Sequence, residues 1–248
     1  MLSMSVVYCR GYGGGIFVNI GADGLMVTDS TVTDCYAQVD GGAIYVYVHN
    51  ADVTISTTLI SNSVAKNDGG GIFSFQYNDN FRLLDSIIYN CSTIDGNGGG
   101  VEVAFFNTGS AINNTIFNDC FARNNGGGIN AEHMNNGLQV FNSTFLNCSS
   151  LESGGGIYVG TSHDSTSIVN SVFQDDGSTN GGSVCLDSSN TNTTIASSYF
   201  YSSLARVSGG AIFVGSMNTD ISIDGGIVRN SIAGEYGGGM FFHKDNSF

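Results

Sequence analysis

One short motif recurs along the whole chain at an almost constant spacing, and this repeat limits the folds that the sequence can adopt. The motif is a pair of glycines, a small residue and an aliphatic residue, as in Gly41-Gly42-Ala43-Ile44. Its nine copies begin at Gly13, Gly41, Gly69, Gly98, Gly126, Gly154, Gly181, Gly209 and Gly237, so successive copies are 27, 28 or 29 residues apart. A fixed period of this length is typical of a repeat protein in which each unit packs on its neighbours.

Aligned on this motif, the repeats show apolar columns that alternate with polar positions. One column starts at Ile16 and Ile44, a second at Val18 and Val46, and two more run through the middle of the repeat. Alternation with a period of two predicts strands with one buried face, and no segment shows a sustained helical period. We therefore predict an all-β fold, a right-handed single-stranded parallel β-helix of about nine coils of about 28 residues, with three short strands in each coil.

Polar columns mark the expected bends between strands. One of them holds Asp29, Asp85, Asn114, Asn142 and Asn170. Asn and Asp satisfy local backbone groups and tolerate left-handed conformations, and stacked amides can bond along the rod. The glycine pair is expected to relax the backbone at the third bend.

Five of the six cysteines share one column: Cys9, Cys35, Cys91, Cys120 and Cys148. Their spacing does not match a zinc site, so no metal is predicted. We expect free thiols packed as small apolar groups. The alternative is a disulfide between neighbouring coils, which would lie at a suitable separation.

The glycine motif is paired with a downstream Phe-x-Asn-type element, as in Phe145-Leu146-Asn147-Cys148. This pairing resembles the repeats of the polymorphic outer-membrane proteins, β-helical surface adhesins best known from chlamydiae, within the pectin-lyase-like superfamily of parallel β-helices. The resemblance extends over essentially the whole chain. It implies a surface-displayed adhesive or structural β-helix, with no catalytic residue to transfer.

The chain is acidic, with Lys+Arg 7 against Asp+Glu 21 and a formal net charge of -14. The basic residues are scattered singly, which argues against nucleic acid and anionic membranes as partners. The longest apolar runs are about half a dozen residues, too short to span a bilayer.

Parallel β-helices also include polysaccharide-cleaving enzymes, and such an enzyme is the main alternative function. A glycosidase needs two carboxylates that face one sugar ring. Asp175-Asp176 is the only adjacent acidic pair, and the four histidines lie in separate coils. We therefore predict no catalysis and no cofactor.

A row of aromatic residues follows the marker aliphatic and should point outward, because it lies between two inward positions. Its members are Phe17, Tyr45, Phe73, Tyr158, Phe213 and Phe241, with Tyr47 and Phe75 beside them. Exposed aromatic patches mark interfaces or sugar-stacking platforms, so these are our candidate ligand-binding residues. The alternative is that neighbouring groups cover them.

Five Asn-x-Ser/Thr sequons occur, at Asn90, Asn113, Asn142, Asn147 and Asn192. Asn113 and Asn192 should point outward and are the best acceptors for glycosylation, and Asn90 and Asn147 are further candidates. Asn142 belongs to a bend column and is expected to stay unmodified.

Neither end of the repeat array carries a polar capping unit, so residues 1–248 are predicted to form one β-helical domain that stacks end to end or on flanking repeats of the same protein. Our prediction is a structural or adhesive module of an extracellular surface or filament. A glycan-binding module is a further alternative.

Overall fold

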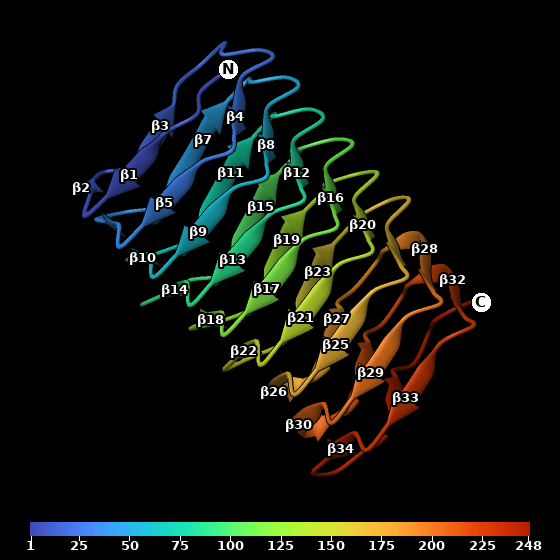
Figure 1. Ribbon diagram of the computed structural model, residues 1–248. Coiled ribbons are helices and arrows are strands. Elements are labelled where there is room, and N and C mark those ends of the chain that lie inside the picture. The colour runs from blue at the N-terminus through green and yellow to red at the C-terminus, as the bar shows by residue number, and fades with distance from the viewer.

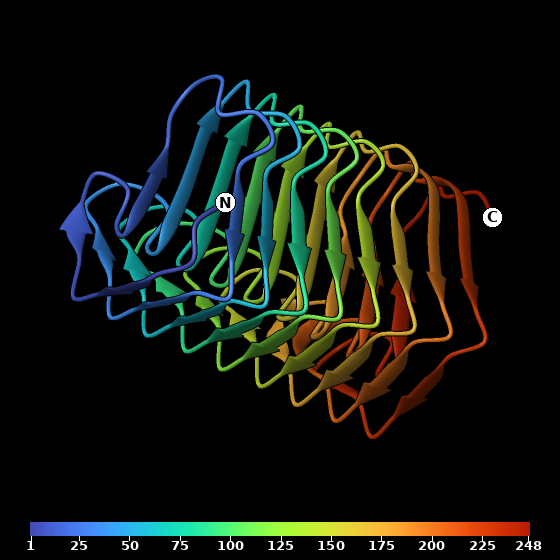
Figure 2. The same cartoon turned by 45° about the horizontal axis from the view of Figure 1, so that its top comes forward.

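The computed structural model describes residues 1–248, and its regular structure consists of 35 β-strands with no helix. The strands form four parallel sheets that run along one axis, with the chain termini at opposite ends of the rod (Figures 1 and 2). Each strand pairs with the strand one turn later. The predicted right-handed parallel β-helix is confirmed.

The sheets are named I to IV in the order in which one turn of the chain passes through them. Sheet I contains β4 (Met26–Thr28), β8 (Thr54–Ser56), β12 (Arg82–Leu84), β16 (Ala111–Asn113), β20 (Gln139–Phe141), β24 (Ser167–Val169), β28 (Thr191–Ala196) and β32 (Thr219–Asp224). Sheet II contains β1 (Ser5–Val7), β5 (Thr31–Thr33), β9 (Leu59–Ser61), β13 (Ile87–Tyr89), β17 (Ile116–Asn118), β21 (Thr144–Leu146), β25 (Val172–Gln174), β29 (Tyr199–Tyr201) and β33 (Ile227–Arg229). Sheet III contains β2 (Arg10–Gly11), β6 (Tyr36–Ala37), β10 (Val64–Ala65), β14 (Ser92–Thr93), β18 (Phe121–Ala122), β22 (Ser149–Ser150), β26 (Gly177–Asn180), β30 (Leu204–Ser208) and β34 (Ile232–Ala233). Sheet IV contains β3 (Ile16–Val18), β7 (Ile44–Val48), β11 (Ile72–Gln76), β15 (Val101–Phe105), β19 (Ile129–His133), β23 (Ile157–Thr161), β27 (Val184–Leu186), β31 (Ile212–Val214) and β35 (Met240–Phe242).

A complete turn has four strands rather than the three that we predicted. The additional strands are those of sheet III, most of them two residues long. Their inward residues are small and buried, for example Ala65, Ala122 and Ser150. Because small and polar side chains give no apolar alternation, the sequence does not distinguish these strands from a bend. The nine motif copies enclose eight complete turns of the rod.

The four predicted apolar columns line the interior and form a single core. In sheet II four phenylalanines stack in register, Phe117, Phe145, Phe173 and Phe200, with ring centroids 4.7–4.8 Å apart and nearly parallel planes. Each fully buried side chain of this size stabilises the fold by about 1.5–3 kcal/mol. Each inner turn thus contributes its own share of this burial, whereas column members of the end turns, such as Met240 and Phe242, are exposed.

The two marker glycines have different structural roles. The first has a positive φ in every copy except Gly13, for example 66° at Gly126, and ends the bend before sheet IV. The second allows close approach of neighbouring turns: a Cβ at Gly127 would overlap the carbonyl oxygens of Gly155 and Ser149. The predicted bend column is also left-handed, as at Asp29 and Asn142, which confirms its expected conformation.

A ladder of asparagines, which we did not predict, lies in the turns between sheets IV and I and runs along the rod. The Asn78 backbone N–H donates to Asn107 Oδ1 at 2.7 Å, and the Asn107 N–H donates to Asn135 Oδ1 at 2.9 Å. The side-chain amides donate back to carbonyls of the preceding turn, as from Asn78 Nδ2 to Tyr47 O at 2.7 Å. The ladder comprises Asn50, Asn78, Asn107, Asn135, Asn190, Asn218 and Asn246.

His163 occupies the one position within this ladder where asparagine is missing, and it is 1% exposed. Its Nδ1 lies 3.0 Å from the Asn135 carbonyl oxygen, and its Nε2 has no partner. Burial lowers the pKa of His163 to about 4. An imidazole therefore leaves a ring nitrogen unsatisfied where an amide would satisfy two backbone groups.

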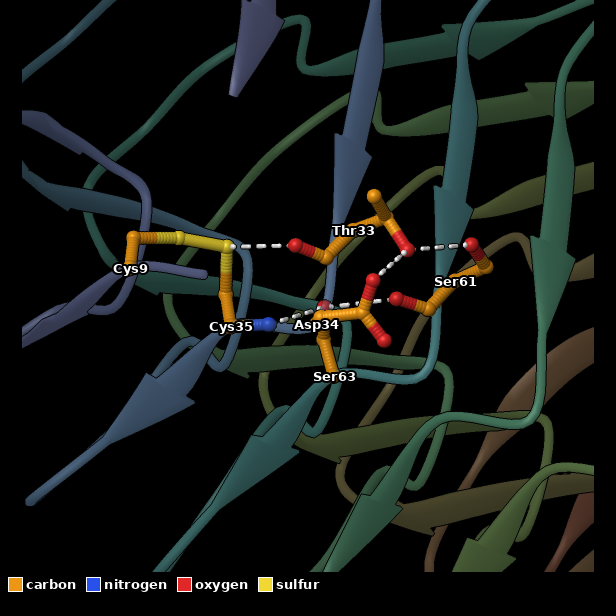
Figure 3. Close-up of a disulfide and its surroundings, with 6 residues drawn as sticks. All are labelled: Cys9, Thr33, Asp34, Cys35, Ser61 and Ser63. Atoms are coloured by element: carbon orange, nitrogen blue, oxygen red, sulfur yellow. Dashed lines mark hydrogen bonds between the residues drawn. A yellow bond between two sulfur atoms is a disulfide. The ribbon is translucent and has the colours of Figure 1, made fainter. Parts of the chain in front are cut away.

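Both states that the sequence leaves open for the cysteine column occur. Cys9 and Cys35 form a disulfide between neighbouring turns, beside the hydrogen-bonded side chains of Thr33 and Ser61 (Figure 3). Cys91, Cys120 and Cys148 are free and buried, as expected for small apolar groups. Burial raises the pKa of Cys91 and of Cys148, so these thiols resist ionisation.

Replacing Gly127 by alanine should disrupt the stacking of turns. The added Cβ meets backbone atoms that cannot move independently, and we expect a loss of about 2–3 kcal/mol or more in the free energy of unfolding. Gly177→Ala is the matched control, because its nearest foreign atom would be Leu204 O at 3.7 Å. Urea unfolding of both variants checks this. Equal losses of stability would show that the close approach of neighbouring turns is not what requires glycine at position 127.

Replacing His163 by asparagine should stabilise the protein, and more so in acid. The fold holds the His163 imidazole neutral, whereas the unfolded chain takes up a proton near pH 6.5, so wild-type stability falls as the pH drops from about 6.5 toward 4. Asparagine does not titrate and removes the unsatisfied nitrogen, worth about 1–3 kcal/mol. Urea unfolding at pH 7.5 and pH 5 should show a larger advantage of the variant at pH 5, with the exposed His243→Asn as control; a constant difference would contradict this.

Candidate functional site

The predicted aromatic row lies on the outer side of sheet IV, where equivalent residues of successive turns pair in register. The row reads Phe17, Tyr45, Phe73, Glu102, Asn130, Tyr158, Cys185, Phe213 and Phe241. It points away from the core, but it is not one continuous aromatic surface. A polar segment at Glu102 and Asn130 divides it into two aromatic stretches.

The first stretch is more buried than we expected. Tyr45 is 5% and Phe73 is 3% exposed, and only Phe17 is widely accessible at 47%. Tyr45 and Phe73 pack edge to face with ring centroids 5.0 Å apart. A second row, formed by Tyr47, Phe75 and Phe105, packs against them. The expectation of solvent exposure is therefore wrong for Tyr45 and Phe73, because neighbouring rings cover them in a small outer cluster.

The second stretch contains half-buried side chains. The Tyr158 hydroxyl donates to Asp187 Oδ2 at 2.8 Å. Burial and the Asp187 carboxylate raise the pKa of Tyr158 above its ordinary value. Phe213 and Phe241 stack with ring centroids 5.5 Å apart. Tyr158 thus belongs with the polar segment rather than with a ring stack.

The polar segment contains a carboxylic acid, Glu102, and an amide, Asn130, that are almost completely buried. Asn130 Nδ2 donates to Glu102 Oε1 at 2.8 Å, while Glu102 Oε2 and Asn130 Oδ1 have no partner. Burial, reinforced by the Asp68 and Glu132 carboxylates, raises the pKa of Glu102 well above its ordinary value. Burial and Asp68 raise the pKa of Glu132 to about 7.

A pocket of about 340 Å³ opens beside this segment. It is lined by Asn97, Phe105, Asn125, Asn130, Glu132, His133, Tyr158 and Thr161. His133 Nδ1 lies 2.8 Å from Thr161 Oγ1 across neighbouring turns. No three His, Cys, Asp or Glu side chains lie together as metal ligands here or elsewhere in the chain.

A further row of large side chains, which sequence reasoning missed, lies at the turn after sheet IV. We call it the turn ridge; it consists of His49, Tyr77, Phe106 and Met134. The rings of His49 and Tyr77 stack at 5.1 Å, and those of Tyr77 and Phe106 at 5.3 Å. All four residues have φ between 51° and 54°. The signal that could have found them is a bulky residue directly before each of Asn50, Asn78, Asn107 and Asn135, the first four asparagines of the buried ladder.

The turn ridge borders a groove of about 560 Å³. Tyr77, Phe106 and Met134 form one side, and Asp79, Thr108, Asn136, Asp164 and Thr191 contribute polar groups. Polar neighbours are already bonded along the rod, as from Thr191 Oγ1 to Asp164 Oδ1 at 2.9 Å. Rings and hydrogen-bonding groups therefore run side by side along the axis.

The acidic pair considered for catalysis is separated by the fold. Asp176 lies buried in the cysteine column, where it accepts the Cys148 N–H at 2.9 Å, and Asp175 is exposed. Burial raises the pKa of Asp176 well above its ordinary value. The two carboxylates do not share a sugar-facing site.

The candidate glycosylation residues lie on the outside of the rod. Asn90, Asn147 and Asn192 are exposed, and Asn113 is half-buried in β16. Asn147 Nδ2 donates to Asp119 Oδ1 at 2.6 Å, and Asn192 Nδ2 to Ser165 Oγ at 3.0 Å. Asn142, also exposed, donates to Asn113 Oδ1 at 3.3 Å. Glycan attachment at these sites stays a prediction.

Comparison with known proteins adds little to this description. No family model matches the chain, and no curated protein matches it in sequence. Among solved structures, it is similar at 10% identity and a TM-score of 0.20 to HetL, a pentapeptide repeat protein involved in heterocyst differentiation regulation from the cyanobacterium Nostoc sp. strain PCC 7120; the match covers 85% of this chain and 87% of that one. The resemblance to polymorphic outer-membrane proteins therefore stays a prediction. The structure contains no helix that is long and apolar enough to cross a bilayer.

Proposed function

We propose that this chain is a non-catalytic structural module of an extracellular surface or filament, which adheres to glycans through the turn ridge. The observation that carries the proposal is the placement of large side chains at exposed left-handed positions. A left-handed conformation costs a residue with a Cβ about 1–2 kcal/mol, and glycine or asparagine would lower that cost. Tyr77 is nevertheless 43% exposed and Met134 39% exposed in this conformation.

Sugar rings are the ligand chemistry that suits this ridge best. Because the ridge rings stack face to face on one another, they offer their edges to a ligand. These edges form an apolar strip against which the C–H faces of pyranose rings can pack, and the polar side of the groove offers carboxylate and amide groups for the sugar hydroxyls. The Tyr77 and Phe106 rings repeat along the rod at 5.3 Å, close to the length of one sugar ring. A straight ladder of such groups favours an extended polysaccharide over a compact ligand.

An extracellular location is supported by the disulfide between Cys9 and Cys35, since such bonds persist in oxidising compartments. The module is also proposed to associate end to end with further turns of the same repeat. Each turn already pairs with the next through all four sheets, so an added turn of the same length would continue these ladders.

The double variant Tyr77→Asn/Phe106→Asn separates adhesion from folding. Relief of about 1 kcal/mol of backbone strain per residue offsets the loss of ring stacking, worth about 0.5–1.5 kcal/mol per pair. We expect the unfolding free energy to change by less than about 1 kcal/mol, while binding to a printed polysaccharide array falls at least tenfold.

Met217→Asn is the matched control, because Met217 has the same left-handed turn position (φ 59°) outside the stacked rings. It should retain wild-type binding. Wild-type protein that binds no polysaccharide on the array, or a double variant that binds as well as wild type, would overturn the proposal.

A further inference from the structure

Two buried oxygen atoms without partners lie at the pocket on sheet IV, one on Asn130, which lines the pocket, and one on Glu102, which lies behind Asn130 and does not line it. Both are independent of the turn ridge. Asn130 is 1% exposed and lines the pocket, and its Nδ2 is turned to Glu102. Its Oδ1 is therefore the amide atom left for a ligand, and it has no partner in the protein. Glu102 Oε2 is likewise unpartnered, in a side chain that is fully buried. A buried acceptor without a partner is destabilising, and a donor group of a ligand would relieve that cost.

The surroundings of these atoms favour a positive charge. Asp40, Asp68 and Glu132 act on Glu102 electrostatically. None of them forms an ion pair, because the only ion pair of the structure joins Lys244 to Asp245 at 4.0 Å. An anion would meet uncompensated carboxylates here, whereas a cation would relieve their repulsion.

The size and lining of the pocket distinguish between kinds of cation. A pocket of about 340 Å³ is much larger than a metal ion, and no cluster of three ligating side chains is present. Phe105 and Tyr158 contribute aromatic walls beside Glu132 and Asn130. An ammonium group has three N–H donors, and a short apolar stem behind it can pack on aromatic rings.

We propose that this pocket binds a primary ammonium group with an apolar surface behind it, the chemistry shared by a lysine side chain, with its methylene stem, and an amino sugar, with the C–H face of its ring. Asn130 Oδ1 and the Glu132 carboxylate accept its hydrogen bonds, and Phe105 packs against the apolar surface. The titratable groups around the bound cation are Asp40, Asp68, Glu102, Glu132, His133 and Tyr158. A cation beside Glu102 and Glu132 favours their charged forms, so binding near pH 7 releases a proton to the buffer.

Isothermal titration calorimetry of the full chain at pH 7 tests this with two probes, Nα-acetyl-lysine amide and glucosamine. Phosphate and HEPES serve as buffers, since a primary-amine buffer would compete. We expect saturable one-site binding of at least one probe, and the tighter one identifies the source of the ammonium. Because the raised pKa of Glu132 leaves this carboxyl partly protonated near pH 7, the enthalpy difference between buffers should report net release of protons on binding.

Three variants locate the binding. Glu132→Gln should lower the affinity for the tighter-binding probe at least tenfold and reduce the proton release. Asn130→Ala should lower that affinity at least threefold. Glu235→Gln, the same chemical change at an exposed residue of the last turn, should leave binding unchanged. Circular dichroism confirms folding of each variant; if Asn130→Ala does not fold, Glu132→Gln alone decides.

Absence of saturable binding of both probes would overturn the proposal. So would equally tight binding of the neutral analogue Nα-acetyl-norleucine amide, or an affinity that Glu132→Gln does not change. These results do not depend on the turn ridge, so polysaccharide binding by that ridge succeeds or fails separately.

Discussion

Direct stacking of one turn on the next is the constraint on which the rest of this structure depends. Every strand pairs with its equivalent one turn later, so each backbone N–H finds a carbonyl only if successive turns keep the same path. The second marker glycine permits this at the tightest point, where a Cβ at Gly42 or Gly127 would overlap a carbonyl of the next turn. The interior then fills with columns of like side chains, of which the phenylalanine stack of sheet II is the clearest.

Departures from a column reveal where neighbouring positions adjust to one another. Asp176 replaces a cysteine, Ser183 replaces a marker glycine or alanine, and Ser203 lies in the next turn. Ser183 Oγ is 3.2 Å from Asp176 Oδ2 and 2.7 Å from Ser203 Oγ, so the buried carboxyl gains hydrogen-bond partners. His163 has no such compensation, and its Nε2 remains unsatisfied. The core thus tolerates polar residues most readily when they occur together.

The outside of the rod is under no such constraint and can vary from turn to turn. Along the outer row of sheet IV the chain places aromatic rings, then a buried acid and amide, then aromatic rings again. The turn ridge adds a parallel line of stacked rings, of which His49 and Tyr77 are exposed and Phe106 is half-buried. A regular scaffold with irregular outer rows is what a module needs if it is to recognise other molecules without moving.

The repeat alone determined the fold class, the inward columns and the left-handed bend at Asp29, because stacking requires a period that any alignment of the chain displays. Tertiary structure decided what that period does not encode. The strands of sheet III have small inward residues that leave no apolar pattern. Burial of Tyr45 and Phe73 depends on rings from neighbouring turns. Which two cysteines of the column form a disulfide, Cys9 and Cys35, also depends on the tertiary structure. The pocket of Asn130 and Glu132 also requires side chains from several turns that lie about 28 residues apart. Alternation tells which way a side chain points, but only packing between turns decides how deeply it is covered and what it touches.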